Sequence, residues 1–337
     1  MSTINLLKMA KLGSLISLSL VMQSALATEQ DDLSELRGKA FTKPSYIVPL
    51  PDEWQKKPIK YPASFGPVDI AVALNQQLFT HLEPLIREYG KKKDLKIKIV
   101  DTTCGSAAGH MFNKEVDIAS FCCPPGKIDR LPGIRFDTLG IHPVAFFVHP
   151  DNPVDGVNLR QLRQIYQGDI ENWSALGGSH KKIDVAGTLH CKKRPGHWKL
   201  LLGHEDDFGP NFINIGMDDS VKRPASNPQI ISFESVLTAQ RFWRDVNVTK
   251  SKIKAIKING YSPENVNHLL AGNYPLYRVF NLTTWEGSAV ENSDAQDLVS
   301  YLIEKVEKTR KDEFLSAAKL KKAGWKFYDN ELIGEPE

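Results

Sequence analysis

The hydrophobic pattern in the first third of the sequence alternates between strand-like and helix-like segments. Residues 68–72 are typical of a strand, residues 76–89 carry apolar side chains at helical spacing, and residues 95–100 alternate as a second strand. A short helical stretch over residues 107–113 and a strand over residues 116–120 follow. Strands separated by helices form parallel sheets, because each helix returns the chain to the start of the next strand. The pattern therefore predicts an α/β protein.

The same alternation continues through the rest of the chain. The continuous apolar run over residues 144–148 is typical of a strand that is buried on both faces of a sheet. A length of 337 residues allows about two compact units at roughly 150 residues per domain. Further along, we expect helices over residues 158–166, 233–246 and 295–308 and strands over residues 183–188 and 253–258.

The charge balance excludes one large class of partners. The sequence has 43 Lys and Arg against 40 Asp and Glu, which gives a formal net charge of +3. Proteins that bind nucleic acid draw most of their affinity from basic residues that neutralise phosphates. A near-neutral chain of this size lacks that excess, so we expect no nucleic-acid partner.

The N-terminal segment differs in character from everything that follows it. Lys8 and Lys11 precede an apolar run over residues 15–22, and residues 25–27 read Ala-Leu-Ala. A basic start, a short apolar stretch and a small-x-small pattern are typical of a cleaved signal peptide, and the stretch is too short for the roughly 20 residues that span a bilayer. We therefore expect residues 1–27 to be removed on export; an uncleaved anchor helix is the alternative.

Two blocks of sequence carry the strongest functional signal. The first covers residues 140–154 and continues through an amphipathic stretch over residues 159–168 to an Asn-Trp pair at residues 172–173. The second, residues 271–278, reads Ala-Gly-Asn-Tyr-Pro-Leu-Tyr-Arg. In both blocks the sequence resembles the phosphate-binding proteins of bacterial ABC transporters, and the resemblance extends in the expected order over about residues 66–305.

The resemblance implies a two-lobe periplasmic binding protein fold of type II, in which each lobe is a mostly parallel sheet flanked by helices. It implies a periplasmic, monomeric solute-binding protein that is not an enzyme, needs no cofactor, and holds a small-molecule ligand between the lobes for a membrane permease or a sensor protein. The implied organisation is a signal peptide at residues 1–27, an N-terminal extension at 28–63, a first lobe at 64–140 plus 260–337, and a second lobe at 141–259.

One ligand loop suits an anion. Residues 104–109 read Cys-Gly-Ser-Ala-Ala-Gly between an expected strand and an expected helix. The first turn of a helix has backbone N–H groups without helical partners and a positive dipole end, which favours a bound anion. The resemblance places Ser106 and its neighbouring amides at the ligand, with Arg194 of a later loop as a second anion contact.

The other ligand loops depart from the family pattern. Residues 70–75 have no hydroxyl where the family has a Gly-Ser pair, and residues 120–124 read Ser-Phe-Cys-Cys-Pro. Residues 190–197 read His-Cys-Lys-Lys-Arg-Pro-Gly-His where the family has a Gly-Ser-Gly-Thr turn. These departures predict weak phosphate binding and leave a small anion or a soft metal or metalloid species as the ligand.

All four cysteines fall in these ligand loops. An exported protein with an even number of cysteines favours a disulfide, with Cys104 bonded to Cys122 or Cys123 inside the first lobe. The second interpretation is a thiolate site for a soft metal, formed by Cys104, Cys122, Cys123 and Cys191, with His190 or His197 as nitrogen ligands. Inert thiols are the third. The residues expected at the ligand are Cys104, Gly105, Ser106, Cys122, Cys123, His190, Cys191 and Arg194.

Two other functions are open on the sequence alone. A thiol-dependent redox or metal-dependent enzyme could use Cys122, Cys123 and His190, although no nucleophile elbow, metalloprotease helix or paired-carboxylate motif is present. Alternatively, the chain could be a binding module for another exported protein, with the proline-rich extension at residues 28–63 as part of the contact.

Overall fold

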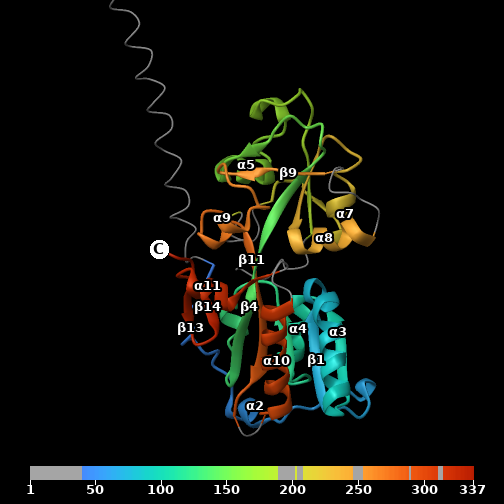
Figure 1. The fold of residues 1–337 in the computed structure, drawn as a ribbon, viewed down its shortest axis with the longest axis vertical. Coiled ribbons are helices and arrows are strands. Elements are labelled where there is room, and N and C mark those ends of the chain that lie inside the picture. Colours follow the sequence, from blue (N-terminus) through green and yellow to red (C-terminus); the bar gives the residue numbers. More distant parts are fainter. Residues whose placement is uncertain (1–39, 189–201, 203–207, 246–252, 288–289, 310–313) are drawn as a thin grey trace, which may run out of the picture.

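The chain folds into two lobes, one above the other in Figure 1, which are joined by long strands that run between them. The lobe with β1, β2 and β3 is called the first lobe below, and the lobe with β6, β7 and β8 the second. The computed structural model describes residues 40–188, 202, 208–245, 253–287, 290–309 and 314–337, and for residues 241–245 it describes the backbone alone.

The first-lobe sheet is parallel at one edge and antiparallel where the connecting strands enter. β1 (Ile70–Asn75) pairs in parallel with β2 (Ile97–Thr102) and with β3 (Ile118–Phe121). β11 (Tyr277–Trp285) then pairs antiparallel with both β3 and β4 (Ile134–Val148). β4 has 15 residues and continues into the second lobe, so the two lobes share one strand pair.

The second-lobe sheet is built on the far end of β4. β8 (Ile230–Ser235) pairs antiparallel with β4 and in parallel with β6 (Asp184–Gly187), which pairs in parallel with β7 (Ile213–Asn214). The sheet order is therefore β2-β1-β3-β11-β4-β8-β6-β7. The short second-lobe strands are β5 (Gly156–Val157), β9 (Lys254–Ala255) and β10 (Lys257–Ile258).

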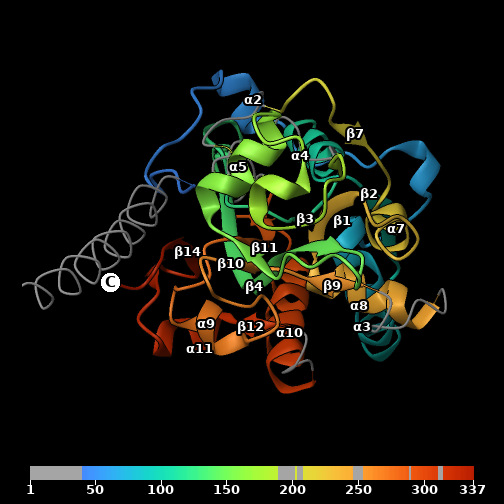
Figure 2. The ribbon, with the colours of Figure 1, turned by 90° about the horizontal axis from the view of Figure 1, so that it is seen from above.

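Helices cover both faces of the first-lobe strands. Figure 2 shows α3 (Gln76–Lys93) and α10 (Ser293–Thr309) on one side of these strands and α4 (Cys104–Phe112) on the other. Helix α3 buries one apolar stripe against the sheet, and it ends at Asp94 in the left-handed conformation at φ 56°. Ahead of the first strand lie α2 (Asp52–Lys56) and the 3-10 turn η1 (Ala63–Phe65).

The second-lobe helices include one correction to the sequence analysis. Residues 233–246 were expected to form one helix, but β8 continues to Ser235 and α8 (Val236–Asp245) begins after it. The alternating Ile-Ser-Phe-Glu at residues 231–234 is typical of a strand, and this strand continues past Phe233, where the helix was expected to begin. The other helices are α5 (Leu159–Gln167), α7 (Met217–Lys222) and α9 (Val266–Leu270), with 3-10 turns η2 (Lys127–Asp129) and η3 (Trp173–Leu176).

The C-terminal segment returns to the strands that join the lobes. The ring of Trp325 meets that of Tyr277 edge-on, with 5.3 Å between centroids. The elements of this segment are β12 (Leu315–Ser316), which pairs with β4, α11 (Ala317–Lys322), and the hairpin of β13 (Lys326–Tyr328) and β14 (Glu331–Gly334). The lobe boundaries at residues 64–140, 141–259 and 260–337 stay a prediction.

The segment before β1 is fastened to the first lobe by a buried lysine. Nζ of Lys114 donates hydrogen bonds to the carbonyl oxygens of Gln55 (3.0 Å) and Lys57 (2.6 Å), and it lies 4.4 Å from the centroid of the Trp54 ring. Burial, followed by the neighbouring Lys57, lowers the pKa of Lys114. Within the part of the chain that the structure describes, no helix has both the length and the apolar character needed to cross a membrane.

Candidate ligand site

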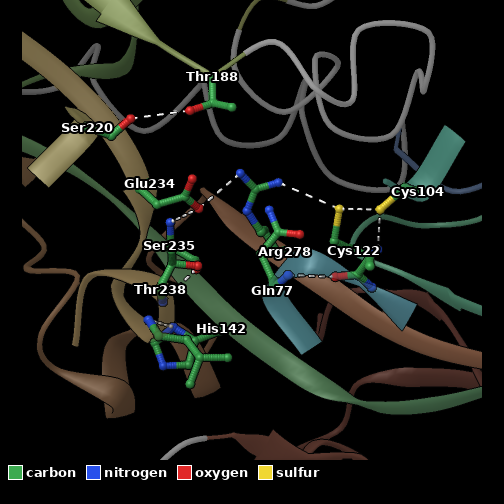
Figure 3. Close-up of polar contacts among 12 residues, drawn as sticks. Gln77, Cys104, Cys122, His142, Thr188, Ser220, Glu234, Ser235, Thr238 and Arg278 are labelled. Carbon is green, nitrogen blue, oxygen red and sulfur yellow. Dashed lines mark hydrogen bonds and ion pairs between the residues drawn. The ribbon is translucent and has the colours of Figure 1, made fainter. Parts of the chain in front are cut away.

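A buried arginine lies where the two lobes meet. Arg278 is the second residue of β11 and stands opposite His142 of β4. Its Nη1 lies 3.9 Å from Sγ of Cys122, in the loop after β3, and its Nη2 lies 3.3 Å from Oε1 of Glu234 on β8 (Figure 3). One guanidinium thus contacts a first-lobe loop and a second-lobe strand.

Glu234 is the second-lobe partner of Arg278. Its Oε1 also accepts a hydrogen bond from the backbone N–H of Ser235 at 2.7 Å. Its Oε2 is buried and has no hydrogen-bond partner among the described residues. The side chains of Arg278 and Glu234 are both 0% exposed, so water does not screen this ion pair. Loss of either member would leave a buried charge uncompensated.

Two cysteines meet beside the arginine. Cys104 is the first residue of α4, and Cys122 directly follows β3. Their sulfur atoms are 2.7 Å apart, and the backbone N–H of Cys122 donates to Sγ of Cys104 at 3.3 Å. Both side chains are buried.

At the carboxyl end of β1, Asn75 is hydrogen-bonded to neighbouring groups of the protein. Oδ1 of Asn75 accepts hydrogen bonds from the backbone N–H groups of Gln77 (3.1 Å) and Leu78 (3.2 Å), which caps α3. Oγ of Ser120 accepts from both the backbone N–H (2.7 Å) and the side-chain Nδ2 (2.8 Å) of Asn75. The backbone and side-chain amides of Asn75 are therefore already engaged, with the hydroxyl oxygen of Ser120 as their acceptor.

The start of α4 is the more open of the first-lobe loops. Thr103 caps the helix, since its Oγ1 accepts from the backbone N–H of Ser106 at 3.2 Å. The hydroxyl of Ser106 lies 3.1 Å from the same Oγ1. Gly105 and Ser106 are exposed, whereas Cys104 is buried. A ligand can therefore reach the first turn of α4 at Gly105 and Ser106.

The backbone N–H groups of Leu237 and Thr238, at the start of α8, already donate hydrogen bonds within the protein. Oγ of Ser235 accepts from the backbone N–H of Thr238 at 3.1 Å, and Nδ1 of His142 accepts from that of Leu237 at 3.2 Å. The hydroxyls of Ser235 and Thr238 are 2.7 Å apart. Because Nδ1 of His142 accepts, the ring proton of the neutral histidine belongs on Nε2.

Three helices begin around the guanidinium of Arg278. Figure 3 draws Gln77, Cys104 and Ser235, which mark the starts of α3, α4 and α8, on different sides of Arg278. The N-terminal end of each helix carries a partial positive charge. The arrangement gives this junction a positive field in addition to the guanidinium, with Glu234 as the opposing charge.

The comparisons with known proteins agree with this architecture. The family model described as the PBP superfamily domain matches residues 62–304. The chain belongs to this superfamily. The phosphate-binding protein PstS of Bacillus subtilis (strain 168) is 26% identical over 146 residues, which are 40% of this chain and 41% of that protein. The matched stretch thus spans less than half of the length of that phosphate-binding protein.

Solved structures of PBP-like phosphate receptors show the same fold. An ABC-type phosphate transport receptor from Vibrio cholerae has a TM-score of 0.58 at 19% identity, covering 72% of this chain and 96% of that one. A putative phosphate ABC transporter substrate-binding protein with bound phosphate, from Clostridium perfringens, has a TM-score of 0.57 at 16% identity, covering 79% and 98%. The predicted two-lobe, type II periplasmic binding protein fold is confirmed, as is the resemblance to phosphate-binding proteins.

The structure brings together some of the residues that were predicted to contact the ligand. Cys104 and Cys122 meet beside Arg278, and Gly105 and Ser106 lie on the exposed first turn of the same helix. Cys123 is buried, and its carbonyl oxygen accepts from Nδ2 of Asn281 at 3.4 Å. The predicted residues His190, Cys191 and Arg194 lie outside the described residues.

The predicted metal site is only partly covered by the structure. The proposed ligands Cys104, Cys122 and Cys123 are described, whereas Cys191 is not. Among the described residues, no group of three or more His, Cys, Asp or Glu side chains is placed to hold a metal ion.

Sequence reasoning did not assign the two charged residues at the centre of the site. Arg278 was part of the second family block, and it is the single charged residue of the stretch that forms β11, which is a recognisable signal of a buried ion pair. Glu234 lay in a segment that was expected to be helical, so its place at the end of a strand was not foreseen.

Proposed function

We propose that this protein is an exported, periplasmic solute-binding protein that holds a small anion between its two lobes and presents it to a membrane permease or a sensor protein. The PBP superfamily match and the phosphate receptors of the same fold support the binding role. We further propose lobe boundaries at residues 64–140 plus 260–337 and 141–259, preceded by an N-terminal extension at residues 28–63.

The observation that carries the proposal is the setting of Arg278. Its guanidinium is buried at the lobe junction, contacts Cys122 and Glu234 from opposite lobes, and is surrounded by the starts of three helices. Guanidinium groups and helix N-termini both favour negatively charged partners. A ligand at this junction would contact both lobes and so stabilise one relative orientation of them.

A thiophilic metal or metalloid is the second candidate, because two cysteine sulfurs lie at the site. The distance between them argues against it. Two thiolates on one metal at bond lengths of about 2.3 Å and a tetrahedral angle would be about 3.8 Å apart, whereas Sγ of Cys104 and Sγ of Cys122 are 2.7 Å apart. We therefore favour the anion.

We also propose that the protein acts by binding and not by catalysis. An enzyme on this fold would need a nucleophile that substrate can reach, with a base in hydrogen-bond contact. Cys104, Cys122 and Cys123 are buried, and the charged side chain beside Cys122 is Arg278, a cation that is not a base. The exposed hydroxyl of Ser106 lies 3.1 Å from the hydroxyl of Thr103, which is not a base.

The direct test is isothermal titration of the folded mature protein with a panel of anions. The panel should contain phosphate, sulfate, nitrate, bicarbonate, chloride and small carboxylates, with copper(I) and arsenite as soft-ligand controls. We expect one anion to bind with a single site per chain. A folded protein that binds no member of the panel contradicts the proposal.

Two arginine variants test whether the anion binds at Arg278, where the two lobes meet. Arg278→Gln should abolish binding of that anion, while Arg87→Gln, whose side chain is 66% exposed in a surface ion pair with Glu83, should leave it unchanged. If Arg278→Gln does not fold, the variant Arg278→Gln/Glu234→Gln removes both buried charges together. Unchanged affinity in the folded variant would overturn the assignment of the site.

A further inference from the structure

We propose that Cys104 and Cys122 form a disulfide bond, which joins the start of α4 to the loop after β3 and fixes the sulfur of Cys122 beside Arg278. The proposal concerns a covalent modification of this chain and does not depend on which ligand the protein binds. It selects one of the two pairings that the sequence favours, in which Cys104 is bonded to Cys122 or to Cys123.

The contact between the sulfurs is the main evidence. The two Sγ atoms are 2.7 Å apart, which is closer than a two-cysteine metal site allows and within about 0.7 Å of the length of a disulfide, about 2.05 Å. The backbone of Cys122 is also held at the sulfur of Cys104 by an N–H···S contact of 3.3 Å. The bond therefore requires the two sulfur atoms to move only about 0.7 Å closer together.

The order of strands explains why residues 18 positions apart meet. β1 lies between β2 and β3, so the ends of β2 and β3 are about 9.5 Å apart at a spacing of about 4.8 Å per strand. Helix α4 leaves β2 and packs across β1 and β3, which carries Cys104 from the β2 side towards Cys122. The hydrogen bonds that Asn75 donates to Oγ of Ser120 join the ends of β1 and β3.

The burial of the two cysteines is typical of a structural disulfide and not of a pair of reactive thiols. The side chain of Cys104 is 1% exposed and that of Cys122 is 0% exposed, so a soluble oxidant does not reach them in the folded protein. The bond must then form while the chain folds, in the oxidising compartment that export implies. Buried disulfides of exported proteins resist reduction by the glutathione pool.

The chemistry is a two-step exchange with a disulfide-bearing oxidant, for which oxidised glutathione serves as the probe. The thiolate of one cysteine attacks the glutathione disulfide, so that one S–S bond breaks, a mixed disulfide forms and one glutathione thiolate leaves. The second cysteine thiolate then attacks the mixed disulfide at the protein sulfur and releases the second glutathione. The protein loses two electrons and two protons, which appear in two molecules of reduced glutathione.

Peptide mapping of the refolded full chain tests the pairing directly. The reduced, denatured protein is refolded in a glutathione redox buffer, free thiols are alkylated under denaturing conditions, and the unreduced protein is digested with trypsin. Cleavage at Lys98, Lys114 and Lys127 places Cys104 in residues 99–114, and Cys122 with Cys123 in residues 115–127. We expect these two peptides to be joined by a reducible bond; alkylated peptides, or a link from residues 99–114 to a peptide with Cys191, would overturn the proposal.

The neighbouring cysteine supplies the matched control. Cys123→Ala should keep the link between residues 99–114 and 115–127, whereas Cys122→Ala should lose it. Reduction during unfolding should lower the melting temperature of wild type and of Cys123→Ala by roughly 5 °C, as expected for the loss of a short closed loop, and should leave Cys122→Ala unchanged. A link that survives Cys122→Ala but not Cys123→Ala assigns the bond to Cys123 and contradicts the proposal.

Discussion

Arg130 and Glu331 form a buried, two-point ion pair that joins residues 201 positions apart. Nη1 of Arg130 lies 3.0 Å from Oε2 of Glu331, and its Nη2 contacts Oε1 of the same carboxylate. The guanidinium also donates to the hydroxyl (2.8 Å) and the carbonyl oxygen (3.0 Å) of Thr42. One side chain therefore fastens both the segment before β1 and the C-terminal hairpin to the first lobe.

We expect Arg130→Met to lower the free energy of unfolding by about 3–5 kcal/mol, because it leaves the Glu331 carboxylate buried without a countercharge. The variant Arg130→Met/Glu331→Met should lose less than Arg130→Met alone. Urea unfolding monitored by tryptophan fluorescence measures both. The surface pair Arg87–Glu83 is the control, since its arginine is 66% exposed and its loss should cost under about 1 kcal/mol.

Asp117 predicts a pH dependence of stability. Burial raises the pKa of its carboxyl group, although hydrogen bonds from the backbone N–H of Ala71 and the side chains of Tyr61 and Asn292 act in the opposite direction. A carboxyl whose pKa is raised on folding contributes stability below its unfolded pKa, about 3.9, and loses that contribution as the pH rises through its folded pKa. The protonated form of Asp117 is therefore the one that folding favours.

The comparison with Asp117→Asn isolates this contribution, because asparagine does not titrate. Relative to Asp117→Asn, wild type should lose free energy of unfolding as the pH rises from 4 towards 7. Urea titrations of both proteins across that range measure the difference. A constant difference between the two proteins, or one that grows in favour of wild type as the pH rises, contradicts the prediction.

The fold was predictable from the sequence because its signals are local. The helical spacing of apolar residues in α3 and the apolar run of β4 are each visible within a single segment. The site was less predictable, since it depends on contacts between segments far apart in the chain. Nothing near Arg278 in the sequence indicates that Glu234 will neutralise it, since the two residues are 44 positions apart in the chain.

The charge of Glu234 should limit anion affinity at the proposed site. Glu234→Gln keeps the size of the side chain and removes the negative charge 3.3 Å from Nη2 of Arg278. An anion should then bind about tenfold more tightly, which corresponds to about 1.4 kcal/mol. Titration with the anion that binds wild type measures this change. Weaker binding in a folded Glu234→Gln protein would mean that the carboxylate itself contacts the ligand.

The sulfur of Cys122 should matter more for the ligand than the hydroxyl of Ser106. Cys122 is buried and its sulfur lies 3.9 Å from Nη1 of Arg278, whereas Ser106 is exposed and its hydroxyl already pairs with Thr103. Cys122→Ser should change the dissociation constant by about tenfold or more, and Ser106→Ala by less than about threefold. Titrations of the two variants with the same anion compare them; a larger effect of Ser106→Ala would move the ligand to the exposed turn of α4.

Phosphate should bind weakly or not at all, although phosphate receptors share the fold. A buried oxyanion needs donors for nearly every oxygen, and each hydrogen bond to a charged group contributes about 1.5–3 kcal/mol. Here the first-turn N–H groups of Gln77 and Leu78 donate to Oδ1 of Asn75, and that of Leu237 donates to His142. Losing three such donors weakens binding by roughly three to six orders of magnitude at about 1.4 kcal/mol per decade. Isothermal titration with phosphate should therefore give no submicromolar site in wild type, and a submicromolar site that persists in Cys122→Ser and in Cys191→Ser would refute this prediction.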